Sequence, residues 1–211
     1  GYGRLDAIRA FETLSSARIV PASTTDNLKG WAYSSIDASQ QDSYTIQSSK
    51  NERLLATLTW NRRVVWTDKR PWGTIEDREL SGYLANLDLE IRDPDGILVN
   101  SNPSTIDNLE KVDLLLTKTG DYIVKIINQS PSESVAYGLA FEILPPIPAD
   151  FNIDYVVDTD DLIGFVPYWL NTDCTGDCFP YDLSPNGQID LSDFAVLADN
   201  WLTYDGRYYN P

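Results

Sequence analysis

The sequence predicts a mainly β chain: an antiparallel β-sandwich or jelly roll with a short N-terminal helix, followed by a small helical domain that carries paired calcium loops. Three observations predict this architecture. Apolar and polar residues alternate from about residue 30 to 144, three prolines then interrupt the pattern, and an aspartate-rich motif repeats 32 residues apart. With 211 residues, 42% of them hydrophobic, the chain is long enough to bury a sizeable core.

The first 29 residues are expected to form a helix and a connector. An apolar residue recurs at every third position, namely Leu5, Ile8, Phe11 and Leu14. This spacing predicts a short helix over residues 4–14 with one apolar face. A connector rich in Ser, Thr and Asn follows, from about residue 15 to 29.

Residues 30–144 are expected to form the sandwich. Apolar residues alternate with polar neighbours in at least six short segments, which is typical of strands with one buried face. The segment Asp93-Pro94-Asp95-Gly96 predicts a tight turn between two strands, and Gly120-Asp121 predicts another. Because no helical pattern intervenes, a sandwich or jelly roll is favoured.

A proline-rich linker over residues 145–149 is expected to end the sandwich, since Pro145, Pro146 and Pro148 cannot donate to a strand ladder. The chain has a net charge of −16, unevenly spread. From residue 150 onward there are 12 aspartates, no glutamate and one arginine, a net −11. This charge disfavours nucleic acid and anionic lipid as partners, and dense short carboxylates suit a cation loop.

Two segments of the acidic region, 150–161 and 182–193, align as twelve-residue loops. Each has oxygen-bearing side chains at positions 1, 3, 5, 9 and 12, and position 7 offers its backbone carbonyl. The expected ligands of one Ca²⁺ are Asp150, Asn152, Asp154, Val156, Asp158 and Asp161. Those of a second Ca²⁺ are Asp182, Ser184, Asn186, Gln188, Asp190 and Asp193. A single such string could be an Asx-rich surface turn, but two in register favour calcium.

The two loops differ in ways that oppose each other. At position 6, Gly187 suits a left-handed backbone, whereas Tyr155 costs about 1 kcal/mol in that conformation. Against this, loop 1 carries four carboxylates and loop 2 carries three, so the affinities are not ranked. Pro167 should interrupt the helix after loop 1, which makes the first half less regular.

The two cysteines, Cys174 and Cys178, are expected to form a structural disulfide. Without histidine they cannot complete a zinc site, and their spacing is not that of a C-x-x-C redox pair. A disulfide and calcium loops together predict an extracellular or cell-surface location. No apolar run is long enough to insert into a membrane.

The chain is expected not to be an enzyme, because it contains no histidine and hence no Ser-His-Asp arrangement. It contains no methionine either, so Gly1 is not a translation start. We therefore expect a processed product or a fragment of a longer protein, whose last residues, 204–211, form a C-terminal tail.

The repeated loop and helix resemble the dockerin family over about residues 149–203. The resemblance rests on the two loops and on Trp169-Leu170 and Trp201-Leu202, which end the two helices 32 residues apart. It implies two bound calcium ions and a protein partner, cohesin-like in the family. No residues that define a recognition code are apparent.

The first part of the chain resembles the C-terminal region of subtilisin-like serine proteases. Residues 1–7 are similar to the start of the last helix of the catalytic domain, and segments within residues 30–110 to the sandwich that follows it. The catalytic segments are absent, so the resemblance implies origin rather than activity. It also makes Asn86, Asp88 and Asp107 candidate calcium ligands, although solvated or turn-capping roles are favoured.

Two weaker motifs remain. Asn128-Gln129-Ser130 is a glycosylation sequon, followed by a proline. Three tryptophans could line a carbohydrate-binding face, but packing in the sandwich core is favoured for Trp60, Trp66 and Trp72.

The preferred functional hypothesis is a non-catalytic attachment or assembly module that calcium folds and that tethers a secreted protein to a partner. The alternative is a released fragment that self-associates as a structural subunit of an extracellular fibre or surface layer, as a homo-oligomer or filament. In that case exposed sheet edges or residues 1–29 would add to a neighbour.

Overall fold

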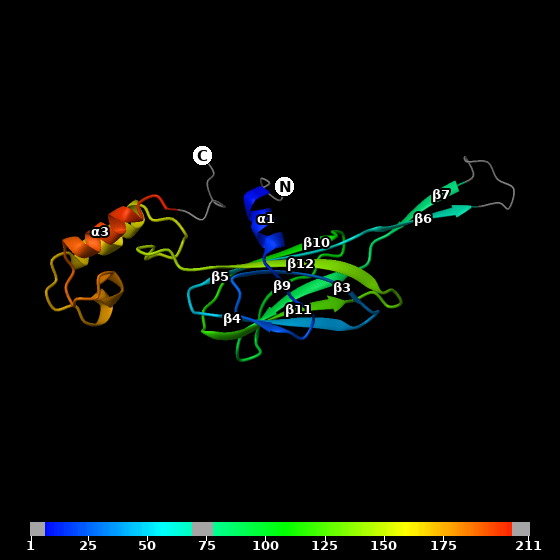
Figure 1. Cartoon of the computed structure of the whole chain (residues 1–211), viewed down its shortest axis with the longest axis horizontal. Coiled ribbons are helices and arrows are strands. Elements are labelled where there is room, and N and C mark those ends of the chain that lie inside the picture. Colours follow the sequence, from blue (N-terminus) through cyan, green and yellow to red (C-terminus); the bar gives the residue numbers. More distant parts are fainter. Residues whose placement is uncertain (1–6, 69–77, 204–211) are drawn as a thin grey trace. The chain divides into compact units, whose positions relative to one another are not determined.

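The computed structural model of the chain describes residues 7–68 and 78–203 (Figure 1). The chain divides into two compact units, Gly1–Leu144 and Pro145–Pro211. Among its described residues, unit 1 contains helix α1 (Ala7–Ser15) and otherwise only strands as regular elements. The strands are β1 (Ala17–Arg18), β2 (Thr24–Thr25), β3 (Lys29–Ile36), β4 (Gln41–Ser48), β5 (Arg53–Trp60), β6 (Arg63–Asp68), β7 (Arg78–Tyr83), β8 (Leu87–Arg92), β9 (Leu98–Asn102), β10 (Leu109–Leu115), β11 (Gly120–Asn128) and β12 (Val135–Leu144).

Two five-stranded sheets form the body of unit 1, with strand orders β1-β3-β12-β5-β10 and β2-β4-β11-β8-β9. From β3 onward, consecutive strands of the two sheets alternate between them, except β8 and β9, which pair within one sheet, and the last strand, β12, lies between β3 and β5. This interleaving is the order of a jelly roll, so the predicted antiparallel sandwich is confirmed.

The core of unit 1 follows from the alternation in the sequence. In β12, every second residue from Val135 to Ile143 is at most 6% exposed, and the residues between them face outward. A polar contact joins the two sheets inside the core, where the hydroxyls of Tyr44 in β4 and Tyr137 in β12 lie 2.7 Å apart. Tyr137 also donates to the Asp42 carboxylate at 2.5 Å, so both buried hydroxyls are satisfied.

The predicted connector after the helix is more ordered than expected. β1 pairs with β3 and β2 pairs with β4, both in parallel, so this segment adds an edge strand to each sheet. Ile19 and Thr25 are buried as a result. Alternation could not reveal strands of two residues.

Helix α1 is present over Ala7–Ser15, and its apolar face is exposed. Ile8, Phe11 and Leu14 share one face, as predicted, but they are 73%, 69% and 65% exposed. Leu5, the fourth residue of that pattern, lies outside the described residues. The helix is held at its polar side, where Lys29 contacts Glu12 at 2.5 Å.

Of the three tryptophans predicted to pack in the sandwich core, the structure describes the side chain of Trp60. Trp60 is 3% exposed and its indole N–H donates to the Ala85 carbonyl at 2.8 Å, which confirms packing for this residue. β6 and β7 form a separate two-stranded sheet, visible beside the sandwich in Figure 1. Trp72 and the side chain of Trp66 lie outside the described residues.

The predicted turn at residues 93–96 joins β8 to β9. The Asp93 carboxylate accepts the N–H groups of Asp95 (3.0 Å) and Ile97 (2.9 Å), and Gly96 takes the left-handed backbone that the turn requires. Lys118 contacts both Asp93 and Asp95, at 2.5 and 2.6 Å, and closes the turn against the loop before β11.

Unit 2 consists of short helices and loops. Its helical segments are α2 (Thr159–Phe165), the 3₁₀ segments η2 (Val166–Tyr168) and η3 (Gly176–Tyr181), and α3 (Leu191–Asp199). Pro167 lies in η2, where α2 gives way to 3₁₀ geometry, as predicted for the first half. A small core holds it together, namely Ala149, Val157, Phe165, Cys174, Cys178, Ile189 and Leu197. None of the helices described in the chain has the length and apolarity that a bilayer crossing requires.

Candidate metal centre

The two predicted loops share one hydrogen-bonding pattern, in register at 32 residues. In loop 1 the Asp150 carboxylate accepts the backbone N–H groups of Asp154 (3.1 Å) and Tyr155 (2.8 Å). In loop 2 the Asp182 carboxylate accepts those of Asn186 (3.1 Å) and Gly187 (2.8 Å). Position 1 of each loop therefore holds the turn at positions 5 and 6.

The residue at position 5 repeats its role too. The Asp154 side chain accepts the N–H of Val156 at 2.9 Å, and the Asn186 side chain accepts that of Gln188 at 2.7 Å. In both loops the side chain at position 5 therefore holds the backbone N–H of position 7. The pattern depends on short oxygen-bearing side chains, which explains the Asp and Asn residues at these positions.

Positions 9 and 12 form the start of the following helix. Asp158 and Asp190 are the N-caps of α2 and α3. The carboxylates of Asp161 and Asp193 accept the backbone N–H groups of these caps at 2.9 and 2.8 Å. Asp161 and Asp193 are 1% and 0% exposed and also accept N–H groups from the beginning of their loops. One carboxylate thus joins both ends of each loop.

Position 6 is left-handed in both loops, as predicted. Tyr155 has φ +70° and Gly187 has φ +80°. Loop 1 has a second left-handed residue, Ile153 (φ +60°), where loop 2 has Pro185, whose ring forbids that conformation. Loop 1 therefore carries more backbone strain than loop 2.

The two halves of unit 2 are tied to each other by backbone hydrogen bonds. The N–H of Leu170 donates to the Ile189 carbonyl (2.9 Å), and the N–H of Leu202 donates to the Val157 carbonyl (2.8 Å). Val157 and Ile189 are position 8 of the two loops. The leucine of each Trp-Leu pair therefore binds the backbone of the loop in the other half of unit 2. The sequence did not indicate this role.

Burial and hydrogen bonding act on the carboxylates in opposite directions. Burial raises the pKa of Asp150, and the negative charges of Asp161 and Asp154 add to the rise. Burial also opposes ionisation of Asp193, but hydrogen bonds from Asp190 and Ser184 outweigh it and lower its pKa.

The donor set of both loops consists of oxygen atoms, which suits a hard cation such as Ca²⁺. Their spacing and the left-handed position 6 also fit a calcium loop. Within residues 7–68 and 78–203, no three acidic, Cys or His side chains gather into a ready-made metal-binding group. The carboxylates at positions 1 and 12 of each loop accept backbone N–H groups.

The predicted disulfide is present between Cys174 and Cys178, with their Cα atoms 5.5 Å apart. The backbone N–H of Cys174 donates to the Gly187 carbonyl at 2.8 Å. The disulfide loop is thereby attached to the turn of loop 2, which its sequence position did not reveal.

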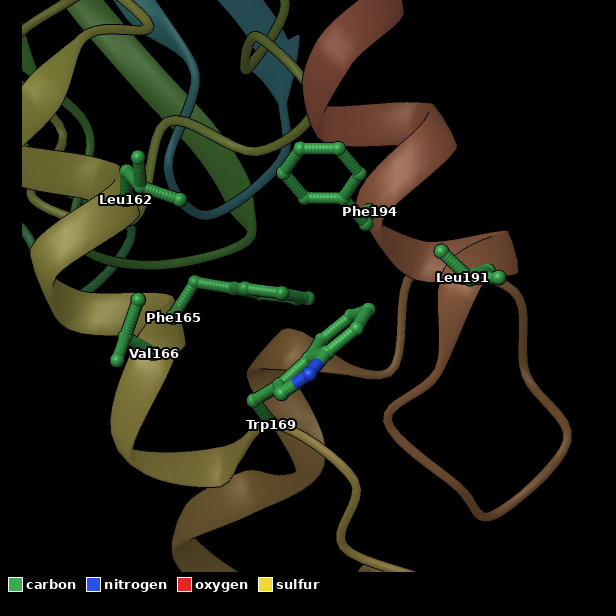
Figure 2. A pocket seen from close by; sticks show the side chains of 6 residues that line it. All are labelled: Leu162, Phe165, Val166, Trp169, Leu191 and Phe194. Carbon is green, nitrogen blue, oxygen red and sulfur yellow. The ribbon is translucent and has the colours of Figure 1, made fainter.

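An apolar face on α2 and α3 is the main feature that sequence reasoning missed. One pocket of about 260 Å³ is lined by Leu162, Phe165, Val166, Trp169, Leu191 and Phe194. A second of about 320 Å³ is lined by Leu162, Phe194, Leu197, Ala198 and Trp201. Figure 2 shows three rings pointing into the first pocket: Phe165 from α2, Trp169 from the end of η2 and Phe194 from α3.

The two pockets are related by the 32-residue repeat. Adding 32 to Leu162, Phe165, Val166 and Trp169 gives the four α3-side residues of the second pocket. Trp169, Phe194 and Trp201 remain 37–40% exposed. The sequence shows these residues as helix faces, but whether a face is covered depends on the packing of the whole unit.

In the sandwich, the candidate ligands Asp88 and Asp107 lie near Glu110, a residue that the sequence did not indicate, whereas the backbone N–H of the third candidate, Asn86, donates to the Ser130 hydroxyl at 3.1 Å. Glu110 is fully buried and accepts the N–H groups of Leu89 (2.6 Å) and Ser104 (2.9 Å). Burial, with smaller effects of Asp88 and Asp107, raises its pKa to about 7. Its position at an inward-facing site of β10 was the available signal.

Asn128, the first residue of the sequon, has a structural role. It is 1% exposed, and its amide donates to the carbonyls of Ile36, Asp37 and Glu133 at 2.8–3.2 Å. Its side-chain oxygen accepts the N–H of Ser130 at 2.9 Å. A buried, fully bonded amide is not accessible to a glycosylating enzyme.

No protein-family model matches the chain, and comparison with curated proteins finds no match. Among solved structures, the chain is similar to a periplasmic inhibitor of g-type lysozyme from Aeromonas hydrophila (12% identity, 60% of this chain and 99% of that chain, TM-score 0.39). It is also similar to the pre-peptidase C-terminal domain of a collagenase from Bacillus anthracis (10% identity, 59% and 92%, TM-score 0.39). A periplasmic inhibitor of g-type lysozyme from Salmonella Typhimurium is similar as well (13% identity, 61% of this chain and 99% of that chain, TM-score 0.34). Likeness at this level carries no conclusion about activity or partners.

Proposed function

We propose that unit 2 is a calcium-dependent docking module, of dockerin type, that attaches a secreted, non-catalytic chain to a protein partner. The observation that carries the proposal is the shared hydrogen-bonding pattern of the two loops. Position 1 holds positions 5 and 6, and position 12 holds both the loop start and the helix cap, in each loop. Two chance turns would not share these four contacts at one spacing.

Calcium would act by neutralising the carboxylates that the loops bring together. Residues 150–211 carry 12 aspartates against one arginine, so their charge is −11 and mutual repulsion opposes the compact unit. The buried Asp161 and Asp193 each end a loop and lie in the first turn of the helix that follows, so a cation bound in each loop would stabilise α2 and α3 as well.

The apolar face supports docking as the purpose of that folding. Both pockets are built from residues of α2 and α3 together, so the face exists only when both helices are in place. Its rim belongs to a strongly acidic unit, which favours a protein partner with an apolar centre and basic surroundings. Such attachment, and the disulfide, favour an extracellular or cell-surface setting.

A calcium titration tests the proposal. Chelated protein should gain helicity and melt at a higher temperature as calcium is added, because the ion binds the folded unit only. Calorimetry should report two bound ions. Asp161→Ala and Asp193→Ala should each remove one ion, and Asp199→Ala, at the exposed end of α3, should remove none. The proposal would be refuted if calcium changed neither the helicity nor the melting temperature and calorimetry detected no heat of binding.

A second candidate function is self-assembly as a structural subunit. Unit 1 exposes two apolar features that favour it: the α1 stripe with Phe11 and Leu14, and the edge strand β9, where Leu98 and Val99 are 44% and 38% exposed. Light scattering over a concentration series, with and without calcium, tests this candidate. A monomer at every concentration in both conditions would exclude it.

A further inference from the structure

Loop 2 contains the chain's one Asn-Gly pair, Asn186-Gly187. Asn186 is exposed at position 5 of the loop. Gly187 has φ +80°, and a Cβ placed on it would meet no atom within 4 Å. No side chain at position 187 therefore separates the Asn186 side chain from the backbone nitrogen of Gly187, and no other atom packs at that point.

We propose that Asn186 is a site of spontaneous deamidation whose rate is set by calcium occupancy of loop 2; the inference rests on the proposed calcium binding. The peptide nitrogen of Gly187 attacks Cγ of Asn186, and the bond from Cγ to the side-chain nitrogen breaks. Ammonia leaves with the proton that Gly187 gives up, and a succinimide ring remains. Water then opens the ring at either carbonyl, which leaves aspartate or isoaspartate at this position.

In the closed loop, hydrogen bonds engage both the Gly187 N–H and the Asn186 side chain. The N–H of Gly187 donates to the Asp182 carboxylate at 2.8 Å, and the Asn186 side-chain oxygen accepts the N–H of Gln188 at 2.7 Å. Attack requires the Gly187 nitrogen to leave Asp182 and turn toward Cγ of Asn186. The reaction therefore proceeds from an opened loop, and a cation that binds the closed loop lowers the population of the reactive state.

The reaction changes the calcium site itself. Asn186 corresponds to Asp154 of loop 1, so the aspartate product gives loop 2 the same four carboxylates that loop 1 has. The isoaspartate product instead adds a carbon to the backbone between positions 5 and 7, which displaces the later ligands. Loss of calcium would thus be followed by a slow and irreversible change of charge or geometry in loop 2 alone.

The chain offers an internal control in Asn152, at position 3 of loop 1. The residue that follows it is Ile153, whose β-branched side chain crowds the attacking nitrogen. Asn152 should persist under conditions that convert Asn186. A general chemical degradation would affect both residues.

The test is to incubate the full chain at mildly alkaline pH, either with chelator or with calcium at about 100 times its Kd, and to follow Asn186 by peptide mass analysis and an isoaspartate assay. Since only the open loop reacts, calcium at this level should slow conversion about 100-fold. Asp182→Ala should restore fast conversion in calcium. Asn186→Asp should bind calcium at loop 2 more tightly than the parent chain.

Calorimetry on the same samples reports calcium binding independently. Equal rates with and without calcium, when calorimetry shows loop 2 occupied, would overturn the inference and leave the docking proposal standing. Asn186 that stays intact in chelator, while a peptide of residues 180–192 converts, would overturn it as well. Absence of any calcium binding would refute the docking proposal and, with it, control of the rate by calcium.

Discussion

The backbone N–H of Leu170 donates to the carbonyl of Ile189 at 2.9 Å, and Ile189 donates back to the next residue, Asn171, at 2.8 Å. The same exchange joins Val157 to Leu202 and Thr203, at 2.8 and 3.1 Å. The end of each half of unit 2 therefore holds the loop of the other half. This reciprocity couples two sites that the sequence presents as independent repeats.

Truncation of the chain after Trp201 should weaken calcium binding at loop 1 rather than at loop 2. It removes both hydrogen bonds to Val157, and two backbone hydrogen bonds contribute about 2 kcal/mol, so we expect a fall in affinity of about tenfold or more. Calorimetry in an Asp182→Ala background, which leaves loop 1 alone, measures the loss. Truncation after Thr203 is the control, and an equal loss there would contradict the coupling.

Removal of the disulfide should destabilise unit 2 and affect loop 2 first. For a loop this short, the chain-entropy argument gives about 2 kcal/mol. Cys174→Ser with Cys178→Ser should therefore lower the melting temperature of the calcium-loaded unit and weaken the contact of Cys174 with the Gly187 carbonyl. A calcium titration in single-loop backgrounds measures the consequence. An affinity loss confined to loop 1 would show that the contact is unimportant.

Gly30→Ala should destabilise the sandwich, whereas Gly138→Ala should not. A Cβ at Gly30 would lie 2.3 Å from the ring of Phe141, a core residue that is 2% exposed, so overpacking should cost about 1–3 kcal/mol. At Gly138 the nearest side-chain atom, on Thr59, is 3.6 Å away, which is ordinary contact. Urea unfolding of both variants tests the difference, and similar midpoints would contradict it.

Stability of unit 1 should fall as the pH rises from about 4.5 to about 7 because of Glu110. Its pKa is higher in the folded than in the unfolded chain, so the folded state holds the proton more tightly and loses that advantage as the carboxyl ionises. One pKa unit corresponds to about 1.4 kcal/mol, so the effect amounts to a few kcal/mol at most.

Denaturant unfolding at several pH values tests this dependence. Glu110→Gln, which cannot ionise, should flatten the pH profile over that interval, whatever its effect on absolute stability. Asp121→Asn, at an exposed position in β11, serves as the control and should leave the profile unchanged. If the parent chain is equally stable at pH 5 and pH 7, ionisation of Glu110 does not lower the free energy of unfolding.

Local patterns predicted the strands and the two twelve-residue loops. Alternation in segments such as residues 135–144 predicts one buried face, and the structure buries that face. The loop residues could be predicted because the hydrogen bonds of Asp150 with Asp154 and Tyr155 span only four and five residues. The spacing of such residues along the chain therefore reflects the geometry of the loop. The Pro167 break and the left-handed position 6 are local for the same reason.

Other features depend on which surfaces meet. The same helical periodicity predicted α1 and its apolar stripe, yet Phe11 is 69% exposed while Phe165 is 1% exposed. Both pairings of the short edge strands are parallel and link residues far apart in sequence, such as Thr24 with Thr45. The apolar face of α2 and α3 arises where two repeats pack together.

The sequence by itself determined the two-part organisation, the strand faces and the oxygen-rich loops, because hydrogen bonds and periodicity act over short stretches of chain. Only the tertiary structure decided that Glu110 is buried beside Asp88 and Asp107, that Leu170 and Leu202 fasten opposite loops, and that the α1 stripe stays exposed. Burial and long-range pairing depend on how distant segments pack, and no local spacing records that.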